Sequence, residues 1–176
     1  TSAKPDVGYL HRCFEKLAEG MTYPMIMPMT DRTDYVASIT NEWAYALAIE
    51  KLAGVQVPER AEYIRVIVGE LQRIMSHIAF WGFYGANLGA FTPLTWPFRD
   101  REAMYDLFES LCGGRLLYNY PRIGGVRNDL PPGWTQKVSD FVDHFEKTIL
   151  PEYHKLLTGN RIFEIRSWSV FWAEAS

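Results

Sequence analysis

Apolar side chains recur at intervals of three and four residues along most of the chain, the spacing that places them on one face of an α-helix. No stretch alternates apolar and polar residues for long enough to predict a strand of useful length. The pattern therefore predicts a mainly α protein built as a helical bundle. Helices are expected over residues 6–20, 34–52, 58–84, 99–111 and 135–157.

Glycine and proline mark the expected helix ends. Gly54 and Gly113 suit C-terminal caps, and Pro58 suits a first helical turn. Pro151 lacks a backbone donor, so we expect it to kink or split the last helix. These positions divide the chain into helices without suggesting a second domain.

The segments between the helices are expected to be loops. Pro24 and Pro28 in MTYPMIMPMTDR (21–32) are expected to forbid a continuous helix, so we predict a buried, methionine-rich loop there. The Gly-rich stretch 84–97 is expected to interrupt the chain before the next helix. PRIGGVRNDLPPGW, residues 121–134, is likewise expected to be a loop.

Composition narrows the class of protein. The 176 residues suffice for one domain with its own core, and a hydrophobic share of 48% argues against disorder. A net charge of −3 with interspersed signs excludes a nucleic-acid footprint, while the high aromatic share of 15% favours a protein interface. No run approaches the roughly 18 apolar residues of a membrane span, so any membrane association is expected to be peripheral.

Two cysteines are present, Cys13 and Cys112, and no CxxC spacing occurs. A zinc or iron–sulfur site made by this chain alone is therefore not expected, and we predict no metal. We predict reduced, buried thiols and a cytoplasmic compartment.

Helical spacing places Glu70, Arg73 and His77 on one face, where they can form one hydrogen-bonded chain. A structural polar seam between helices is the favoured interpretation of this face over direct catalysis. A second candidate cluster lies at the start of the expected 34–52 helix and consists of Asp31, Arg32, Asp34 and Tyr35. Its phenol, beside ion-paired groups, could donate a proton or a hydrogen bond to a bound carbonyl. From the residues alone, helix-capping acids beside a partly buried tyrosine are favoured there.

Two further basic groups have ordinary alternatives. Arg122 precedes Gly124 and Gly125, a pattern that suits either a close backbone approach or a simple turn. Arg12 beside His11 could face an electron-rich partner, although a solvent-facing pair is the simpler interpretation.

Several of these stretches together resemble one family. They are GYLHRCFEKLAEG, YPMIMPMTDRTDYV, NEWAYALAIEKLAGVQVPERAEYIRVIVGELQRIMSHI, LGAFTPLTWPFRDREAMYDLFE and PRIGGVRNDLPPGW. Their order, from about residue 6 to 166, is similar to that of the 49-kDa (bacterial D-type) subunit of complex I, the NADH:quinone oxidoreductase. That family descends from the large subunit of nickel–iron hydrogenases, so the resemblance implies a hydrogenase-type helical bundle.

The resemblance also implies partners and a place in the cell. In the family this subunit lies against the subunit that carries the terminal 4Fe–4S cluster, and it shapes the pocket for the quinone headgroup. The C-type subunit and the membrane subunit of the quinone channel are further implied partners. The expected location is peripheral, on the cytoplasmic side of the inner membrane, or the matrix side in mitochondria.

The family motifs assign expected roles to individual residues. Tyr35 is expected to hydrogen-bond a quinone carbonyl and to supply a proton as quinone is reduced. The other assignments follow from motif positions: quinone-pocket support by Asp34, His77 and Asn87, a cluster-facing surface from Arg12, Arg32 and Arg122, and the polar seam of Glu70 and Arg73.

Some positions depart from the family pattern. Asn87 stands where the family has an acidic residue, so a carboxylate proton relay there is not expected. Leu117 replaces a histidine, which predicts weaker coupling between redox state and protonation, and Cys13 replaces a glycine. The histidine loop that faces the second quinone carbonyl is not found, and residues 167–176 leave the family pattern.

We therefore expect a truncated or excerpted subunit that is inactive on its own. Two alternatives stay open: a non-catalytic helical scaffold, and the equivalent subunit of a related membrane complex fed by ferredoxin.

Overall fold

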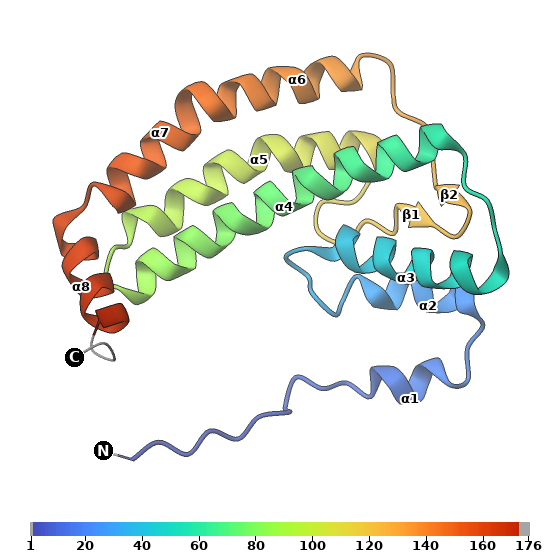
Figure 1. Cartoon of the computed structure of the whole chain (residues 1–176), viewed down its shortest axis with the longest axis horizontal. Helices are drawn as coiled ribbons and strands as arrows, with labels where there is room; N and C mark the ends of the chain where they lie inside the picture. The colour runs from blue at the N-terminus through green and yellow to red at the C-terminus, as the bar shows by residue number, and fades with distance from the viewer. Residues whose placement is uncertain (1, 173–176) are drawn as a thin grey trace.

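The computed structural model describes residues 2–172, and its regular structure is almost entirely helical (Figure 1). This confirms the predicted mainly α class; the hydrogenase-type arrangement stays a prediction. The elements in chain order are α1 (Phe14–Ala18), α2 (Tyr23–Thr30), α3 (Ser38–Ala53), α4 (Glu59–Asn87), α5 (Thr92–Cys112), β1 (Pro121–Arg122), β2 (Gly125–Val126), α6 (Trp134–His144), a π-helical turn (Phe145–Ile149), α7 (Leu150–Tyr153), a second π-helical turn (His154–Thr158) and α8 (Arg161–Trp172).

The long helices α4 and α5 form an antiparallel hairpin at the centre of the molecule, and α6 and α7 run back along α5 (Figure 1). On the other side, α2 packs on α3, and α3 packs on the N-terminal part of α4. Strands β1 and β2 pair antiparallel, with Arg122 opposite Gly125, and contact α3 and α4. The segment before α1 extends away from this body.

The core lies where α4, α5 and α6 meet. The predicted inner face of α4 is largely confirmed, because Ile64, Leu71, Met75 and Ile78 are buried. Trp134 is also buried, at the start of α6, and ties that helix to α5 by donating its indole N–H to the Leu107 carbonyl at 2.9 Å. The bundle thus closes through apolar packing and a satisfied buried indole.

Glycines on α4 let α5 approach closely. A Cβ added at Gly82 would lie 2.9 Å from the Pro97 ring, and one added at Gly85 would lie 2.9 Å from the Pro93 ring. We predicted a loop over 84–97, but α5 already begins at Thr92. Pro93 occupies its first turn, where a proline costs no hydrogen bond.

Other predicted bounds shift for local reasons. Of the predicted 6–20 helix only α1 is helical, because the apolar side chains before it are exposed and have nothing to pack on. The predicted 34–52 helix begins at Ser38 instead, after a turn. It ends at Gly54 as predicted, with φ 68°.

The prediction of a loop over 21–32 was wrong. Pro24 lies in the first turn of α2, and Pro28 is tolerated inside it at the loss of one backbone donor. Ile26 and Met27 are buried and α2 packs on α3, so tertiary burial favours the helix.

The last predicted helix is interrupted as expected near Pro151, which lies between two π-helical turns. The small β1–β2 hairpin inside the expected 121–134 loop was not predicted. Neither was α8. The expected departure at 167–176 lies partly outside the described residues.

The β1–β2 hairpin is held by a buried ion pair. The Arg65 side chain is fully buried and contacts both carboxylate oxygens of Glu50, at 3.1 and 2.5 Å. Arg65 also donates to the carbonyls of Gly125 and Arg122, while the Gly124 amide donates to Glu50 at 2.7 Å. Burial raises the pKa of Glu50, but these hydrogen bonds and the Arg65 charge outweigh it, so the pKa is lowered overall.

Arg65→Met should therefore lower the free energy of unfolding by about 3–5 kcal/mol, because it leaves a buried carboxylate and two carbonyls without their donor. Urea unfolding measures the change. Arg60→Met is the matched control on the same helix, since it breaks only the exposed pair with Asp129. Equal midpoints for both variants would contradict the importance of the buried pair.

Candidate functional site

Arg12 and Arg32, two of the three residues predicted to face a cluster, line the same hollow. It measures about 450 Å³ and lies between α1 and the end of α2. Below, it is called the arginine hollow; its lining residues are Leu10, His11, Arg12, Phe14, Glu15, Leu17, Met29, Arg32 and Thr33. Arg32 also donates to the Pro28 carbonyl, which caps the end of α2.

Cys13 lies between Arg12 and Phe14, two residues that line the arginine hollow. Its φ of 57° and ψ of 34° lie in the left-handed region, which glycine adopts freely and other residues do not. This conformation explains why a glycine is the expected residue there. The prediction of buried thiols was wrong for Cys13, which is exposed, because the short α1 buries no residue; Cys112 is partly buried and its pKa is raised by burial.

Tyr35 lies in the turn between α2 and α3 with 60% of its side chain exposed. Among the described residues, no hydrogen bond engages its hydroxyl. The neighbouring Asp34 accepts the Val36 amide at 3.1 Å, a local side-chain turn that fixes the backbone beside Tyr35. The tyrosine therefore presents its phenol outward from a constrained turn.

Asp31, a member of the candidate cluster with no predicted role of its own, is a buried acid. It is 1% exposed and accepts the Asn119 amide at 3.2 Å. Burial raises its pKa from 3.8 to about 6, against the opposing effects of the Asn119 amide, Arg32 and Arg122. Arg122, the third predicted cluster-facing residue, donates its Nε–H to the Asn119 carbonyl at 3.2 Å.

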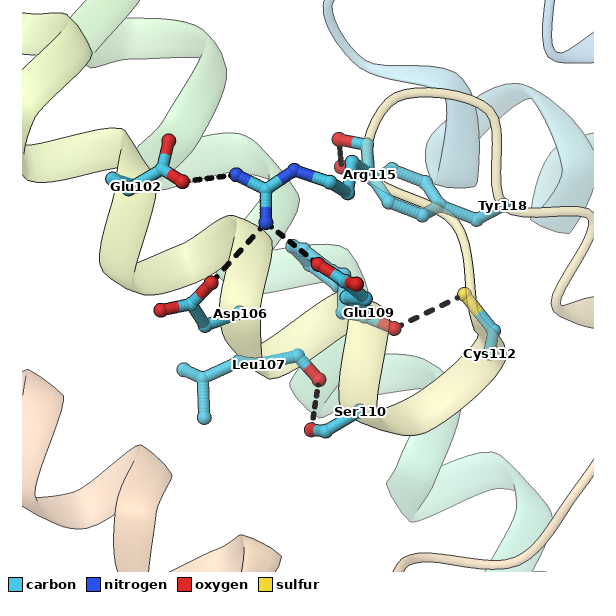
Figure 2. A network of polar contacts seen from close by, with 9 residues as sticks. Glu102, Asp106, Leu107, Glu109, Ser110, Cys112, Arg115 and Tyr118 are labelled. Atoms are coloured by element: carbon cyan, nitrogen blue, oxygen red, sulfur yellow. Dashed lines mark hydrogen bonds and ion pairs between the residues drawn. The ribbon is translucent and has the colours of Figure 1, made fainter.

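A network of surface ion pairs holds the start of residues 115–122, the segment that contains Asn119 and Arg122 (Figure 2). Arg115 reaches back to α5, where it pairs with Glu109 at 2.6 Å, with Asp106 at 3.2 Å and with Glu102. Tyr118 donates to the Arg115 carbonyl and packs its ring on Phe108. The segment that leads to Asn119 and Arg122 is thus anchored before it enters the core.

The remaining predicted residues lie away from this region. Glu70 and Arg73 pair at 3.1 Å on α4, but both are exposed, as is His77, so this face does not lie between helices within the described chain. Asn87 is the last residue of α4, at the end far from α2 and α3 (Figure 1). Within this chain, Tyr35, His77 and Asn87 are not brought together.

The described residues offer no evident centre of their own for a metal. No three His, Cys, Asp or Glu side chains in residues 2–172 gather as ligands would. In the same part of the chain, no helix is both long and apolar enough to cross a membrane.

The described residues thus form a helical body with a hollow lined by Arg12 and Arg32 and with Tyr35 exposed. The family model of the 49-kDa subunit of respiratory-chain NADH dehydrogenase matches residues 87–175, half of the chain, and the chain belongs to this family. The match includes most of the 167–176 segment; its expected departure from the family stays a prediction.

Bacterial relatives agree with this assignment. The chain is 52% identical to the second D-type subunit of NADH-quinone oxidoreductase from Symbiobacterium thermophilum, over 97% of its length and 48% of the relative. It is 50% identical to the D-type subunit of Chlorobium luteolum (95% and 42%) and 49% identical to that of Geobacillus kaustophilus (93% and 44%). The chain thus spans less than half the length of each of these relatives.

The raised pKa of Asp31 predicts an unusual pH dependence. A folded pKa above the unfolded value means that the stabilisation is present below pH 3.8 and lost as the pH rises through about 6. The loss amounts to about 3 kcal/mol at most. The Asp31→Asn variant cannot ionise at this position. The difference in free energy of unfolding between the variant and the wild type should therefore shift in favour of the variant, by up to about 3 kcal/mol, as the pH is raised from 4 to 7. Urea unfolding at both pH values measures it. A constant difference across this range would contradict the assignment.

The left-handed backbone at Cys13 predicts different effects for two substitutions. Cys13→Gly should preserve or increase the helicity of α1, because glycine relieves strain of about 1 kcal/mol. Cys13→Val should reduce it, since a β-branched residue is strongly disfavoured in this region. Backbone chemical shifts of residues 14–18 measure both. A valine variant with unchanged shifts would argue against the left-handed turn.

Proposed function

We propose that the chain forms part of the quinone-reducing site of an NADH:quinone oxidoreductase, next to an iron–sulfur cluster held by a partner subunit. The observation that carries the proposal is the arginine hollow, together with the exposed Tyr35 two residues after its lining residue Thr33, in a chain of this family. The relatives' names give the reaction, which is reduction of quinone by NADH.

The chain's residues suit the side of such a site rather than its metal centre. A 4Fe–4S cluster needs four ligands, usually thiolates, and the chain has two cysteines, of which Cys112 is partly buried. The cluster is therefore assigned to a partner. Arg12 and Arg32 supply fixed positive charge on an exposed surface, which favours the reduced state of a cluster placed against it.

Tyr35 is the group assigned to the quinone. Its exposed hydroxyl can donate a hydrogen bond to a quinone carbonyl and release a proton to the oxygen as it gains negative charge. Asp34 holds the turn that orients it. His77 and Asn87 lie on separate parts of α4, so they would support the quinone pocket from surfaces other than the turn of Tyr35.

The partners and the location follow from this role. The cluster-bearing subunit would lie against the arginine hollow, and the C-type and membrane subunits would complete the pocket at the cytoplasmic or matrix face of the membrane. Peripheral attachment is compatible with the lack of a membrane-spanning helix in the described residues.

A scaffold role is the second candidate, favoured by one observation. Four phenylalanines near the tip of the α4–α5 hairpin are exposed, and two of them make an edge-to-face contact at 6.4 Å. Exposed aromatic side chains of this kind are common in interfaces. These residues are Phe80, Phe83, Phe91 and Phe98.

Tyr35→Phe in the assembled complex distinguishes the two candidates. Loss of the phenolic proton should reduce quinone reductase activity by about tenfold or more, because a positioned proton donor contributes about 10²–10⁴-fold. Electron transfer from NADH to an artificial acceptor upstream should be unchanged. Tyr63→Phe, at another exposed tyrosine, is the matched control. Full activity of the Tyr35 variant in a correctly assembled complex would leave only the scaffold role.

A further inference from the structure

Two acids on different elements hold successive backbone amides of one segment. Asp31, which follows α2, accepts the Asn119 N–H at 3.2 Å. Glu42, on α3, accepts the Tyr120 N–H at 2.8 Å. Both acids are buried, at 1% and 0% exposure. Below, the four residues are called the carboxylate clamp.

The clamp stabilises a backbone conformation that would otherwise be disfavoured. Asn119 has φ 45°, in the left-handed region, where asparagine is tolerated better than most residues. In this conformation its carbonyl accepts the Nε–H of Arg122 at 3.2 Å. The orientation of the Arg122 guanidinium thus depends on a backbone turn that the two acids hold.

The clamp contains more acceptors than donors. The second oxygens of Asp31 and Glu42 and the side-chain oxygen of Asn119 are buried, and none has a hydrogen-bond partner among the described residues. Burial raises the pKa of Asp31 to about 6, which favours its protonated form more than in a free aspartate. A protonated Asp31 can donate to one of these oxygens and still accept the Asn119 amide.

The charged and titratable groups around Asp31 come from several elements. Arg32 follows it in the chain, Arg122 approaches from β1, and both lower its pKa by their charge. Cys112 on α5 is also close enough for Asp31 to raise the pKa of its thiol. Glu42 faces the same segment from α3. Asp31 is therefore within electrostatic range of both arginines.

We propose that Asp31 and Glu42 are positioning residues, which orient Arg122 by clamping the backbone at Asn119 and Tyr120. The proposal rests on the proposed function only where it assumes that Arg122 faces the redox centre of a partner. The clamp itself is a property of this chain. Asp31→Asn preserves an acceptor for the amide and adds a donor for an unpaired oxygen, whereas Asp31→Ala removes the contact.

Hydrogen exchange of arginine Nε–H groups tests the clamp in the full chain. The Arg122 signal is assigned by its loss in Arg122→Lys. Arg65, whose Nε–H is bonded to the Gly125 carbonyl, reports whether the fold is intact. In Asp31→Ala the Arg122 exchange rate should rise about tenfold, the effect of losing one hydrogen bond, while the Arg65 rate stays constant. Asp31→Asn should leave both rates within about twofold of the wild type.

The same pattern is expected at the second acid, with Glu42→Gln compared with Glu42→Ala. An unchanged Arg122 rate in both alanine variants, with faster exchange of the Asn119 and Tyr120 amides, would overturn the positioning role. An Asn variant that behaves like the Ala variant would also overturn it, because the hydrogen bond would then not be the cause.

The assembled complex separates this inference from the proposed function. Arg122→Ala should lower the reduction potential of the partner's cluster, because it removes a nearby positive charge. An unchanged potential, with the exchange results as expected, would overturn the proposed role of Arg122 and leave the clamp supported. A shifted potential with an unchanged exchange pattern would support the function and overturn the clamp.

Discussion

The buried pair of Arg65 and Glu50 is the contact on which the arrangement of the other parts depends. It joins α3 to α4 and, through backbone groups of residues 122–125, attaches the β1–β2 hairpin to both helices. An isolated charge in this position would be prohibitively costly, so each atom of the pair has to find a partner. That requirement fixes the position of the β1–β2 hairpin, because its backbone groups are the partners. Apolar packing alone would define this position less specifically.

Charged groups anchor the segment from 115 to 126 at three points, in addition to the core packing of Tyr118 and Tyr120. Carboxylates of α5 hold Arg115 at its start, the carboxylate clamp holds its middle, and the Arg65–Glu50 pair holds its end. These anchors come from α5, the end of α2, and α3 with α4. The position of the segment that carries Arg122 therefore depends on the relative positions of these helices.

Much of the helical fold follows from local sequence, and the exceptions have identifiable causes. The period of Ile64, Leu71 and Met75 predicts α4 because burial and helical spacing agree there. The prolines of α2 and α5 misled the prediction, since a proline in a first turn costs nothing and tertiary burial offsets the one at Pro28. Short helices such as α1 depend on contacts, which spacing alone does not reveal.

The candidate site was less accessible to prediction. Family motifs pointed to Arg12, Arg32 and Tyr35, and the structure places the two arginines together. The partners of Asp31 and Glu42 lie far along the chain and are backbone amides, which carry no residue-specific signal. A usable signal did exist for Glu50 and Arg65. Each is a charge on a helix face that the helical period assigns to the core, and two such charges suggest a buried pair.

The close contacts of Gly82 and Gly85 with the rings of Pro97 and Pro93 have a consequence for motion. Each ring sits against a glycine on the facing helix, so α4 and α5 cannot slide along each other by a fraction of a turn without collision. The two helices should consequently move together as one rigid unit. A displacement at the tip of the α4–α5 hairpin, near the exposed phenylalanines, would then be transmitted along α4 to the helix turns that carry Arg65. It would not be absorbed by movement between the two helices.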